Sequence, residues 1–258
     1  MSERHEKFEV AGTPRIGLRL PAGQARFVQG STGSVEIRMT GSEDAIERFL
    51  VEERGGEIVI EPESGGRIGR WSGVSIEIGV GAPAAIRARL ASGDVVVAMA
   101  AESLAIDAAA GDIVAEDVAG DVKVKTASGD VRLGSVEGRL DVAAASGDVH
   151  VRSVAGDVTA KTASGDIAIG DAAGSVSAHS ASGEIVLRRL TGDSFNAKTL
   201  SGDVRLGVTS GRKFSVSFQS LSGDVHTDFP VASDSAGATT ARLVVKTMSG
   251  DVLVTAAD

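Results

Sequence analysis

The chain has 258 residues and a net charge of −9, with no cysteine, no tyrosine, seven phenylalanines and a single tryptophan. The absence of cysteine excludes a disulfide framework and a thiolate metal site. An acidic chain with few aromatic residues and no basic stripe is a poor match for nucleic acid, so we expect no nucleic-acid partner.

The first residues, 1–7, are polar, and no apolar stretch of signal-peptide length follows them. No run of apolar residues anywhere in the chain is long enough to span a membrane. We therefore expect no direct membrane insertion and a cytoplasmic location. Export by a route that is not visible in the sequence is the alternative.

Residues 1–88 lack a strict repeat but alternate in several places between apolar and polar side chains. This alternation predicts strands over residues 16–20, 34–39 and 74–80. We interpret the region as an irregular, β-rich N-terminal cap, because the open end of a repeat structure otherwise invites edge-to-edge aggregation.

Two local signals in this region predict specific structures. Arg54-Gly55-Gly56 lies between two short apolar stretches and predicts a hairpin. Ser42 is expected to cap a short helix over residues 43–48, because a serine side chain accepts hydrogen bonds from the free backbone N–H groups of a first helical turn.

The loop over residues 64–73 is a candidate contact loop. It combines glycines with Arg67, Arg70 and Trp71, and tryptophan and arginine are common at binding hot spots. The alternative is that Trp71 folds back over the end of the repeat region.

Residues 79–84 weakly resemble a dinucleotide-binding loop. A phosphate-binding loop must lead into a helix. The following residues, 86–90, alternate as a strand instead, so we expect no cofactor.

Residues 89–258 are dominated by a nine-residue repeat of the type Ala-Ser-Gly-Asp-Val-x-Val. Its glycines fall at an unbroken spacing of nine, at Gly111, Gly120, Gly129, Gly138, Gly147, Gly156, Gly165, Gly174, Gly183 and Gly192. Units with the full Ser-Gly-Asp turn alternate with plainer units, so two units are expected to form one coil.

When each unit is numbered with its glycine at position four, apolar residues recur at positions two, six and eight, as in Ala127, Val131 and Leu133. Positions six and eight have strand periodicity, and we expect all three to point inward. The repeat predicts an all-β fold: a parallel β-solenoid, or β-helix, with coils of about 18 residues and strands stacked at roughly 4.8 Å. A four-sided coil of twice that length is the alternative.

An acidic residue follows the glycine of each richer unit, and the stacked coils are expected to align these residues in a row. The row contains Asp94, Asp112, Asp130, Asp148, Asp166, Glu184, Asp203, Asp224 and Asp251. The carboxylates could accept hydrogen bonds from turn N–H groups, pair with lysine or arginine, or bind Ca²⁺. We favour the first role, in which the carboxylates accept hydrogen bonds from turn N–H groups. We expect no metal, because a single acid per coil supplies too few oxygens for calcium.

The other candidates for catalytic or metal-binding residues are weak. His150 and His226 occupy outward strand positions and His179 the last position of a unit, so they are interpreted as surface histidines. Serine and aspartate come from the repeat itself, so their presence beside histidine does not indicate a catalytic triad. We expect no catalytic residue.

With its repeated Ala-Ser-Gly-Asp-Val phrase and irregular β-rich lead-in, the chain resembles the bacterial putative-adhesin family of unknown function. The resemblance covers most of the chain, and residues 92–254 carry it. It implies a non-enzymatic binding or scaffold protein that is adhesin-like or linked to envelope or stress signalling. The expected partner is an unknown protein or a surface polymer, together with self-association through the solenoid ends.

The alternative functions are a Ca²⁺-binding solenoid and a carbohydrate-active β-helix enzyme. Such an enzyme needs clustered acids and aromatic side chains in a groove. This chain has few aromatic residues, and its repeated acids are placed at turns.

Overall fold

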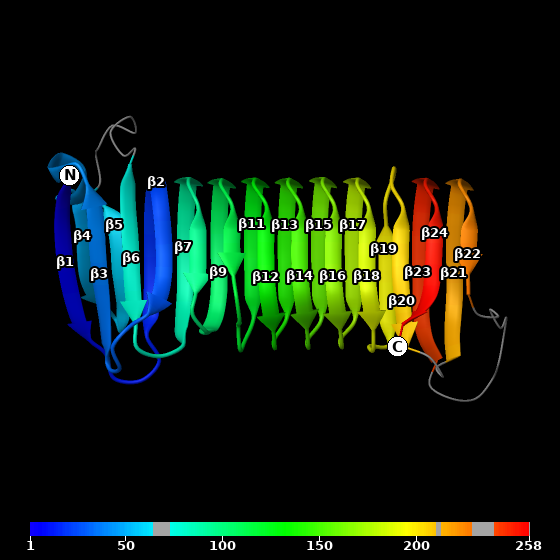
Figure 1. Cartoon of the computed structure of the whole chain (residues 1–258), viewed down its shortest axis with the longest axis horizontal. Helices are drawn as coiled ribbons and strands as arrows, with labels where there is room; N and C mark the ends of the chain where they lie inside the picture. The colour runs from blue at the N-terminus through cyan, green and yellow to red at the C-terminus, as the bar shows by residue number, and fades with distance from the viewer. Residues whose placement is uncertain (64–72, 210–212, 229–239, 258) are drawn as a thin grey trace. The chain divides into compact units, whose positions relative to one another are not determined.

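The computed structural model describes residues 1–63, 73–209, 213–228 and 240–257. Within these residues the protein is all-β, with one short helix, α1 (Glu43–Ile46) (Figure 1). The chain divides into two compact units, Met1–Leu133 and Gly134–Asp258, called unit 1 and unit 2 below.

The strands of unit 1 precede and include the start of the regular repeat. They are β1 (Ser2–Glu9), β2 (Arg15–Gln29), β3 (Ser34–Gly41), β4 (Phe49–Arg54), β5 (Glu57–Pro62), β6 (Val74–Val80), β7 (Ala84–Ser92), β8 (Val95–Ala98), β9 (Ala101–Ala110), β10 (Ile113–Ala115) and β11 (Val122–Ser128). The next strand, β12 (Val131–Val136), contains the boundary between the units.

The strands of unit 2 continue the repeat to the end of the chain. They are β13 (Leu140–Ser146), β14 (Val149–Val154), β15 (Val158–Ser164), β16 (Ile167–Ala172), β17 (Val176–Ser182), β18 (Ile185–Leu190), β19 (Ser194–Lys198), β20 (Val204–Thr209), β21 (Lys213–Ser222), β22 (Val225–Thr227), β23 (Thr240–Ser249) and β24 (Val252–Ala257).

Each unit contains a parallel solenoid with two strands per coil, as the repeat predicts. In unit 1, Val95 pairs with Ile113, which pairs in turn with Val131. In unit 2, Leu140 of β13 pairs with Val158 of β15. The partners in each pair are 18 residues apart, so the coil of about 18 residues is confirmed and the four-sided alternative is wrong.

The core is formed by the inward positions of the strands. Val149 and Val151 on β14 are buried, while His150 between them is exposed. Positions six and eight therefore point inward, as predicted.

Position two behaves differently in the two kinds of unit. It is buried in plain units, as at Val136 and Val154, but exposed in the Ser-Gly-Asp units, as at Ala127 and Ala145. The prediction that position two always points inward is therefore wrong. The reason is the alternation of the strand: Val122, Val124 and Thr126 of β11 are buried, so Ala127 faces outward. The Thr126 hydroxyl also donates a hydrogen bond to the Ser128 carbonyl at 3.0 Å.

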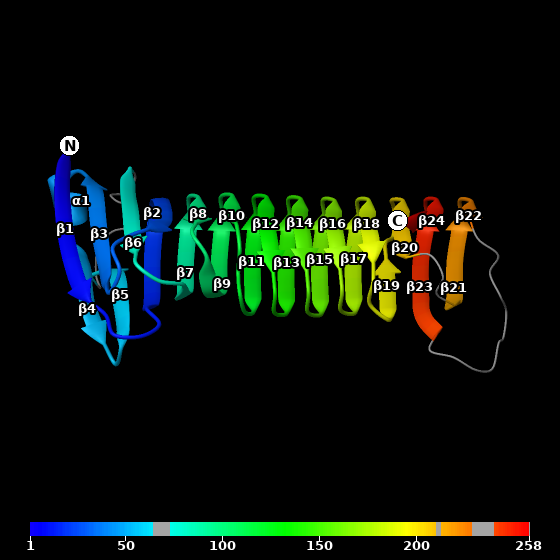
Figure 2. The ribbon, with the colours of Figure 1, turned by 60° about the horizontal axis from the view of Figure 1, so that its bottom comes forward.

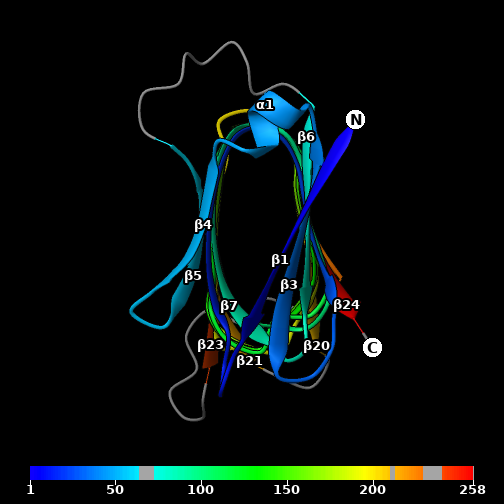
Figure 3. The same ribbon diagram turned by 90° about the vertical axis from the view of Figure 1, so that its left-hand side faces the viewer.

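The N-terminal strands of unit 1 close one end of its coils. β2 forms the first coil and pairs in parallel with β5 and β6 on one side and with β7 and β8 on the other. β3 pairs antiparallel with both β6 and β1, and the view along the coils shows β1 running obliquely across the end with α1 beside it (Figure 3).

The predicted strands and hairpin of this region are confirmed, and the helix differs. Arg54 pairs with Glu57 across the β4–β5 turn. Helix α1 ends at Ile46, and the Ser42 side chain makes no capping hydrogen bond; the Ser42 carbonyl accepts from Ala45 and Ile46 instead. The helix predicted to reach residue 48 is therefore shorter: residues 47–48 form a turn, and strand β4 begins at Phe49.

The end of unit 2 does not follow sequence order. β23 pairs with β19 on one side and β21 on the other, and β24 lies in the same way between β20 and β22. The last two strands of the sequence therefore lie inside the stack, and β21 and β22 form the outermost coil of this unit (Figure 2). None of the helices in the described part of the chain is long and apolar enough to cross a membrane.

Candidate functional site

The row of acids forms two hydrogen-bonded ladders, one in each unit. In unit 1, Oδ1 of Asp94 accepts from the backbone N–H of Asp112 at 3.0 Å, and Oδ1 of Asp112 accepts from that of Asp130 at 2.9 Å. In unit 2 the corresponding N···O distances are 2.9 Å for Asp166 to Asp148, 2.7 Å for Glu184 to Asp166, 2.9 Å for Asp251 to Asp203 and 2.8 Å for Asp224 to Asp251. One oxygen of each accepting carboxylate is therefore committed to the backbone of the next coil.

Arginines from the following strands add positive charge to the ladders. Arg132 lies 2.7 Å from Asp130 Oδ2 and 3.9 Å from Asp112 Oδ2. Arg205 pairs with Glu184 and lies 3.7 Å from Asp203. No group of three histidine or acidic residues that could hold a metal ion occurs in the described ranges. The geometry is that of a structural ladder, in which backbone N–H groups and arginines engage the carboxylates.

The histidines of unit 2 lie on three different strands, β14, β17 and β22. His179 lies 3.0 Å from the Ser177 hydroxyl. Burial, followed by the charges of Lys198 and Lys161, lowers the pKa of His179 below its ordinary value of 6.5. His226 lies 3.3 Å from Asp228 at the surface. The structure does not bring these imidazoles together.

Two further candidates concern unit 1. The predicted contact loop with Arg67, Arg70 and Trp71 lies outside the described residues. The rejection of a dinucleotide loop agrees with the structure, because residues 86–90 form part of strand β7.

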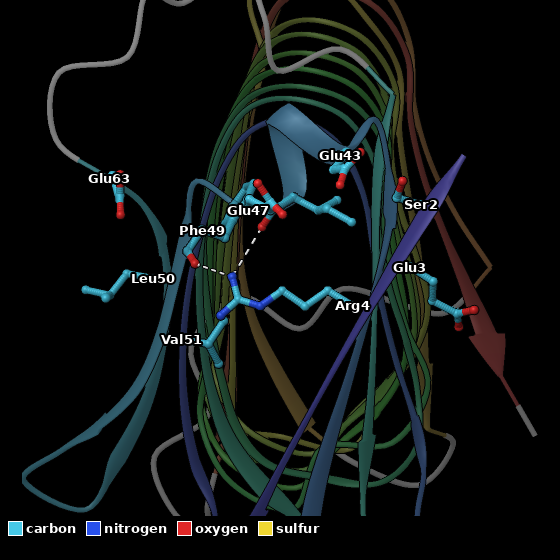
Figure 4. A pocket seen from close by; sticks show the side chains of 10 residues that line it. Ser2, Glu3, Arg4, Glu43, Glu47, Phe49, Leu50, Val51 and Glu63 are labelled. Carbon is cyan, nitrogen blue, oxygen red and sulfur yellow. Dashed lines mark hydrogen bonds between the residues drawn. The ribbon is translucent and has the colours of Figure 1, made fainter.

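A hollow of about 630 Å³ lies at the N-terminal end of unit 1, between β1, α1 and β4. Arg4 reaches across it, and its guanidinium donates to the carbonyls of Phe49 at 2.6 Å and Ile46 at 3.3 Å (Figure 4). The same side chain pairs with Glu6 at 2.9 Å. Arg4 therefore links β1 to the α1–β4 connection, and its guanidinium N–H groups already donate to partners within the protein.

Five successive strands of one row in unit 2 carry no acidic residue. They are β15, β17, β19, β23 and β21, whereas β13, which precedes β15 in the same row, carries Asp141. The outward positions of the five strands place Lys161, His179, Lys198 and Lys246 on successive strands as Cα partners. The three lysines are exposed, and neighbouring strands are about 4.8 Å apart. The three lysines, Lys161, Lys198 and Lys246, are called the cation column below.

A second column of large apolar side chains runs beside the cation column at the end of unit 2. Leu200, Met248 and Leu221 are 54%, 53% and 80% exposed, and they are called the apolar ladder below. With Met1 and Val225 they are the large apolar side chains that are exposed in the described part of the chain.

Sequence reasoning missed the apolar ladder, although a signal was present. The residue before Ser-Gly is alanine in the earlier coils that contain this phrase, at Ala91, Ala127, Ala145, Ala163 and Ala181. It becomes leucine or methionine only in the last three coils.

The apolar ladder and the cation column share a hollow of about 800 Å³ against β19, β23 and β21. Its lining includes Lys198, Lys246 and the three apolar ladder residues, with Phe218 and Val225 among the rest. None of the residues that line it is acidic or a histidine. The hollow therefore suits a ligand with negative charge and apolar surface.

Among solved structures, the chain is similar to a putative adhesin from Bacteroides fragilis, with a TM-score of 0.58 and 13% identity over 98% of this chain and 97% of that chain. It is also similar to a putative lipid binding protein from Parabacteroides distasonis, with a TM-score of 0.44 and 12% identity over 99% and 97% of the two chains. A putative adhesin from Parabacteroides merdae gives a TM-score of 0.44 and 9% identity over 99% and 96%. At these identities a likeness shows the fold alone.

None of the curated proteins is a significant match to the chain. A family model does match, over residues 20–208 and again over residues 162–255. Its description is Toastrack DUF4097, and the two matches together span most of the sequence. The β-solenoid chain described above therefore belongs to the Toastrack DUF4097 family.

Proposed function

We propose that this chain is a non-enzymatic binding protein that attaches to a surface molecule bearing negative charges, and that the cation column of unit 2 makes the contact. The observation that carries the proposal is the absence of acidic residues from five successive strands, β15, β17, β19, β23 and β21, in a chain with a net charge of −9. Because a local surface of one sign attracts the opposite sign, the column favours an anionic partner.

The lining of the nearby hollow supports binding over catalysis. Glycoside hydrolysis requires a pair of carboxylates on either side of the bond that is broken. The titratable side chains in this lining are Lys198 and Lys246, and the repeated acids are held in ladders at the turns. The carbohydrate-active alternative therefore lacks its acid and base at this site.

The name of the Bacteroides fragilis neighbour, a putative adhesin, supports attachment to a surface molecule. A role in envelope or stress signalling stays a prediction from the sequence resemblance.

The test measures binding to two acidic probes, polygalacturonate and vesicles that contain phosphatidylglycerol, and to the neutral probes dextran and phosphatidylcholine vesicles. The double variant Lys198→Gln, Lys246→Gln is compared with Lys123→Gln, Lys125→Gln, which removes the same charge from exposed positions on β11. We expect the parent protein to prefer acidic probes and to lose affinity as salt rises. The β19–β23 variant should bind about thirtyfold more weakly, since each of the two cations contributes about 1 kcal/mol near an acidic surface. Equal binding by both double variants, or no preference for acidic probes, would overturn the proposal.

A further inference from the structure

We propose that the acidic partner is a lipid bilayer with anionic headgroups, and that the apolar ladder of Leu200, Met248 and Leu221 enters it while the cation column contacts the headgroups. This inference rests on the proposed function and names the partner class for the same surface. It departs from the sequence-based expectation of no direct membrane insertion, because that expectation considered only membrane-spanning segments.

The first step is that the fold does not require large side chains at these positions. Ala163 and Ala181 occupy the corresponding position on β15 and β17, in coils with the same strand pairing. The side chains of Leu200, Met248 and Leu221 are at least half exposed, so they contribute little to the core. Large apolar side chains gathered at one exposed place mark a site of interaction.

The second step is the placement of charge beside the apolar ladder. Lys198 and Leu200 are two residues apart, as are Lys246 and Met248, and in both pairs the intervening threonine is buried. Lys246 and Met248 lie on β23, where residues two apart point to the same side. Leu200 follows the end of β19 and lines the same hollow as Lys198. A lysine therefore lies near an apolar side chain at both places. Surfaces that lie in a membrane interface combine apolar insertion with cations at headgroup level in this way.

The third step concerns the acidic ladder beyond the turn. Asp203 follows Leu200 by three residues, past Gly202, and Arg205 on the opposite strand row lies 3.7 Å from its carboxylate. Asp251 uses Oδ1 to accept from the backbone of Asp224. Arg205 therefore partly offsets the charge of Asp203, and one oxygen of Asp251 is engaged by the backbone of Asp224. The lining of the hollow itself contains Lys198 and Lys246 and no acidic residue.

A soluble acidic polymer would need the cation column but not the apolar ladder. A bilayer uses both, since cations give about 1 kcal/mol each near an acidic surface and buried methylene groups about 0.8 kcal/mol each. Exposed leucine and methionine beside lysines therefore favour the bilayer.

The experiment measures binding of the full chain to phosphatidylglycerol-containing vesicles by sedimentation, and to polygalacturonate in parallel. The triple variant Leu200→Ala, Met248→Ala, Leu221→Ala restores the residue of the earlier coils, so it is expected to fold, which a cooperative thermal melt verifies. We expect it to bind acidic vesicles about tenfold more weakly and to bind polygalacturonate within about twofold of the parent. The double variant Ala163→Leu, Ala181→Leu extends the apolar ladder and should bind vesicles more tightly.

The outcomes separate the two proposals. If the triple variant binds acidic vesicles as the parent does while Lys198→Gln, Lys246→Gln loses binding, the bilayer inference is wrong and the proposed function stands. If the lysine variant keeps all its binding, the proposed function fails as well. If the triple variant changes only the oligomeric state in light scattering, the apolar ladder is a contact between copies of the chain and the bilayer inference is overturned.

Discussion

The backbone N–H of Asp166 donates to Oδ1 of Asp148 at 2.9 Å, one full coil away along the solenoid of unit 2. Each acid of the ladder therefore acts first as a hydrogen-bond acceptor between coils. Asparagine keeps an oxygen at the same place, whereas alanine removes the acceptor and leaves a backbone donor unsatisfied.

We expect Asp148→Asn, Asp166→Asn to change the free energy of unfolding by less than about 1 kcal/mol. The matching double alanine variant should lose about 2 kcal/mol, because each lost hydrogen bond contributes about 1 kcal/mol. Urea denaturation measures both values, and millimolar Ca²⁺ should not shift the melting temperature of the parent. A calcium-dependent rise that the asparagine variant lacks would show instead that the ladder is an ion site.

Val149 and His150 are neighbours on β14 that face opposite ways, and they allow a matched test of the strand register. Val149 is fully buried and His150 is exposed. Val149→Asp should lower the free energy of unfolding by about 3–5 kcal/mol, because it buries an unpaired charge. His150→Asp should stay within about 0.5 kcal/mol of the parent. Thermal melts that show equally mild effects would contradict the inward and outward assignment.

Arg4 connects β1 to the α1–β4 segment through hydrogen bonds to two carbonyls, and its side chain is 28% exposed. Arg4→Met keeps the apolar stem and removes these bonds. We expect a loss of about 1–3 kcal/mol in the free energy of unfolding. Arg54→Met is the control, since the Arg54 ion pairs are at the surface and contribute about 0–1 kcal/mol. Equal decreases in the free energy of unfolding in both variants would show that the link made by Arg4 stabilises the protein no more than a surface ion pair does.

His179 should make part of the stability of the protein dependent on pH. Burial and the charges of Lys198 and Lys161 hold its pKa below 6.5 in the folded state, so the unfolded chain takes up this proton more readily. Its contribution is present above the unfolded pKa of about 6.5 and is lost as the pH falls from there through the lower folded pKa. Urea denaturation at about pH 7.5 and about pH 5.5 should therefore show a smaller acid loss for His179→Gln than for the parent. An identical loss in both proteins would contradict this prediction.

The nine-residue spacing was sufficient to predict the solenoid and its coil length. A glycine and an inward pair such as Val149 and Val151 recur in every unit, and both are requirements of the coil backbone. The side of Ala127 could not be predicted in the same way. Alanine is small enough for either side of a strand, so its apolar character does not decide its side; the alternation of β11, in which Thr126 is buried, places it outside.

The candidate binding surface could be predicted only in part. The lysines of the cation column are visible in the sequence, but the partnership of Lys198 with Lys246 depends on β23 lying beside β19. A regular repeat implies that strands stack in sequence order. The sequence pattern carries no local signal that β23 lies between β19 and β21. Parallel pairing of β23 with either neighbour satisfies the same backbone N–H and C=O groups.

The position of β23 and β24 inside the stack has a consequence for how the protein is made. A ribosome releases β21 and β22 before residues 240–257 exist, yet these two strands have their native partners only in β23 and β24. The outermost coil therefore lacks its native partners until residues 240–257 are synthesised and pair with β19 and β20. The strands at this end therefore cannot pair in the order in which they are synthesised, and β23 and β24 join the outermost coil to the rest of unit 2.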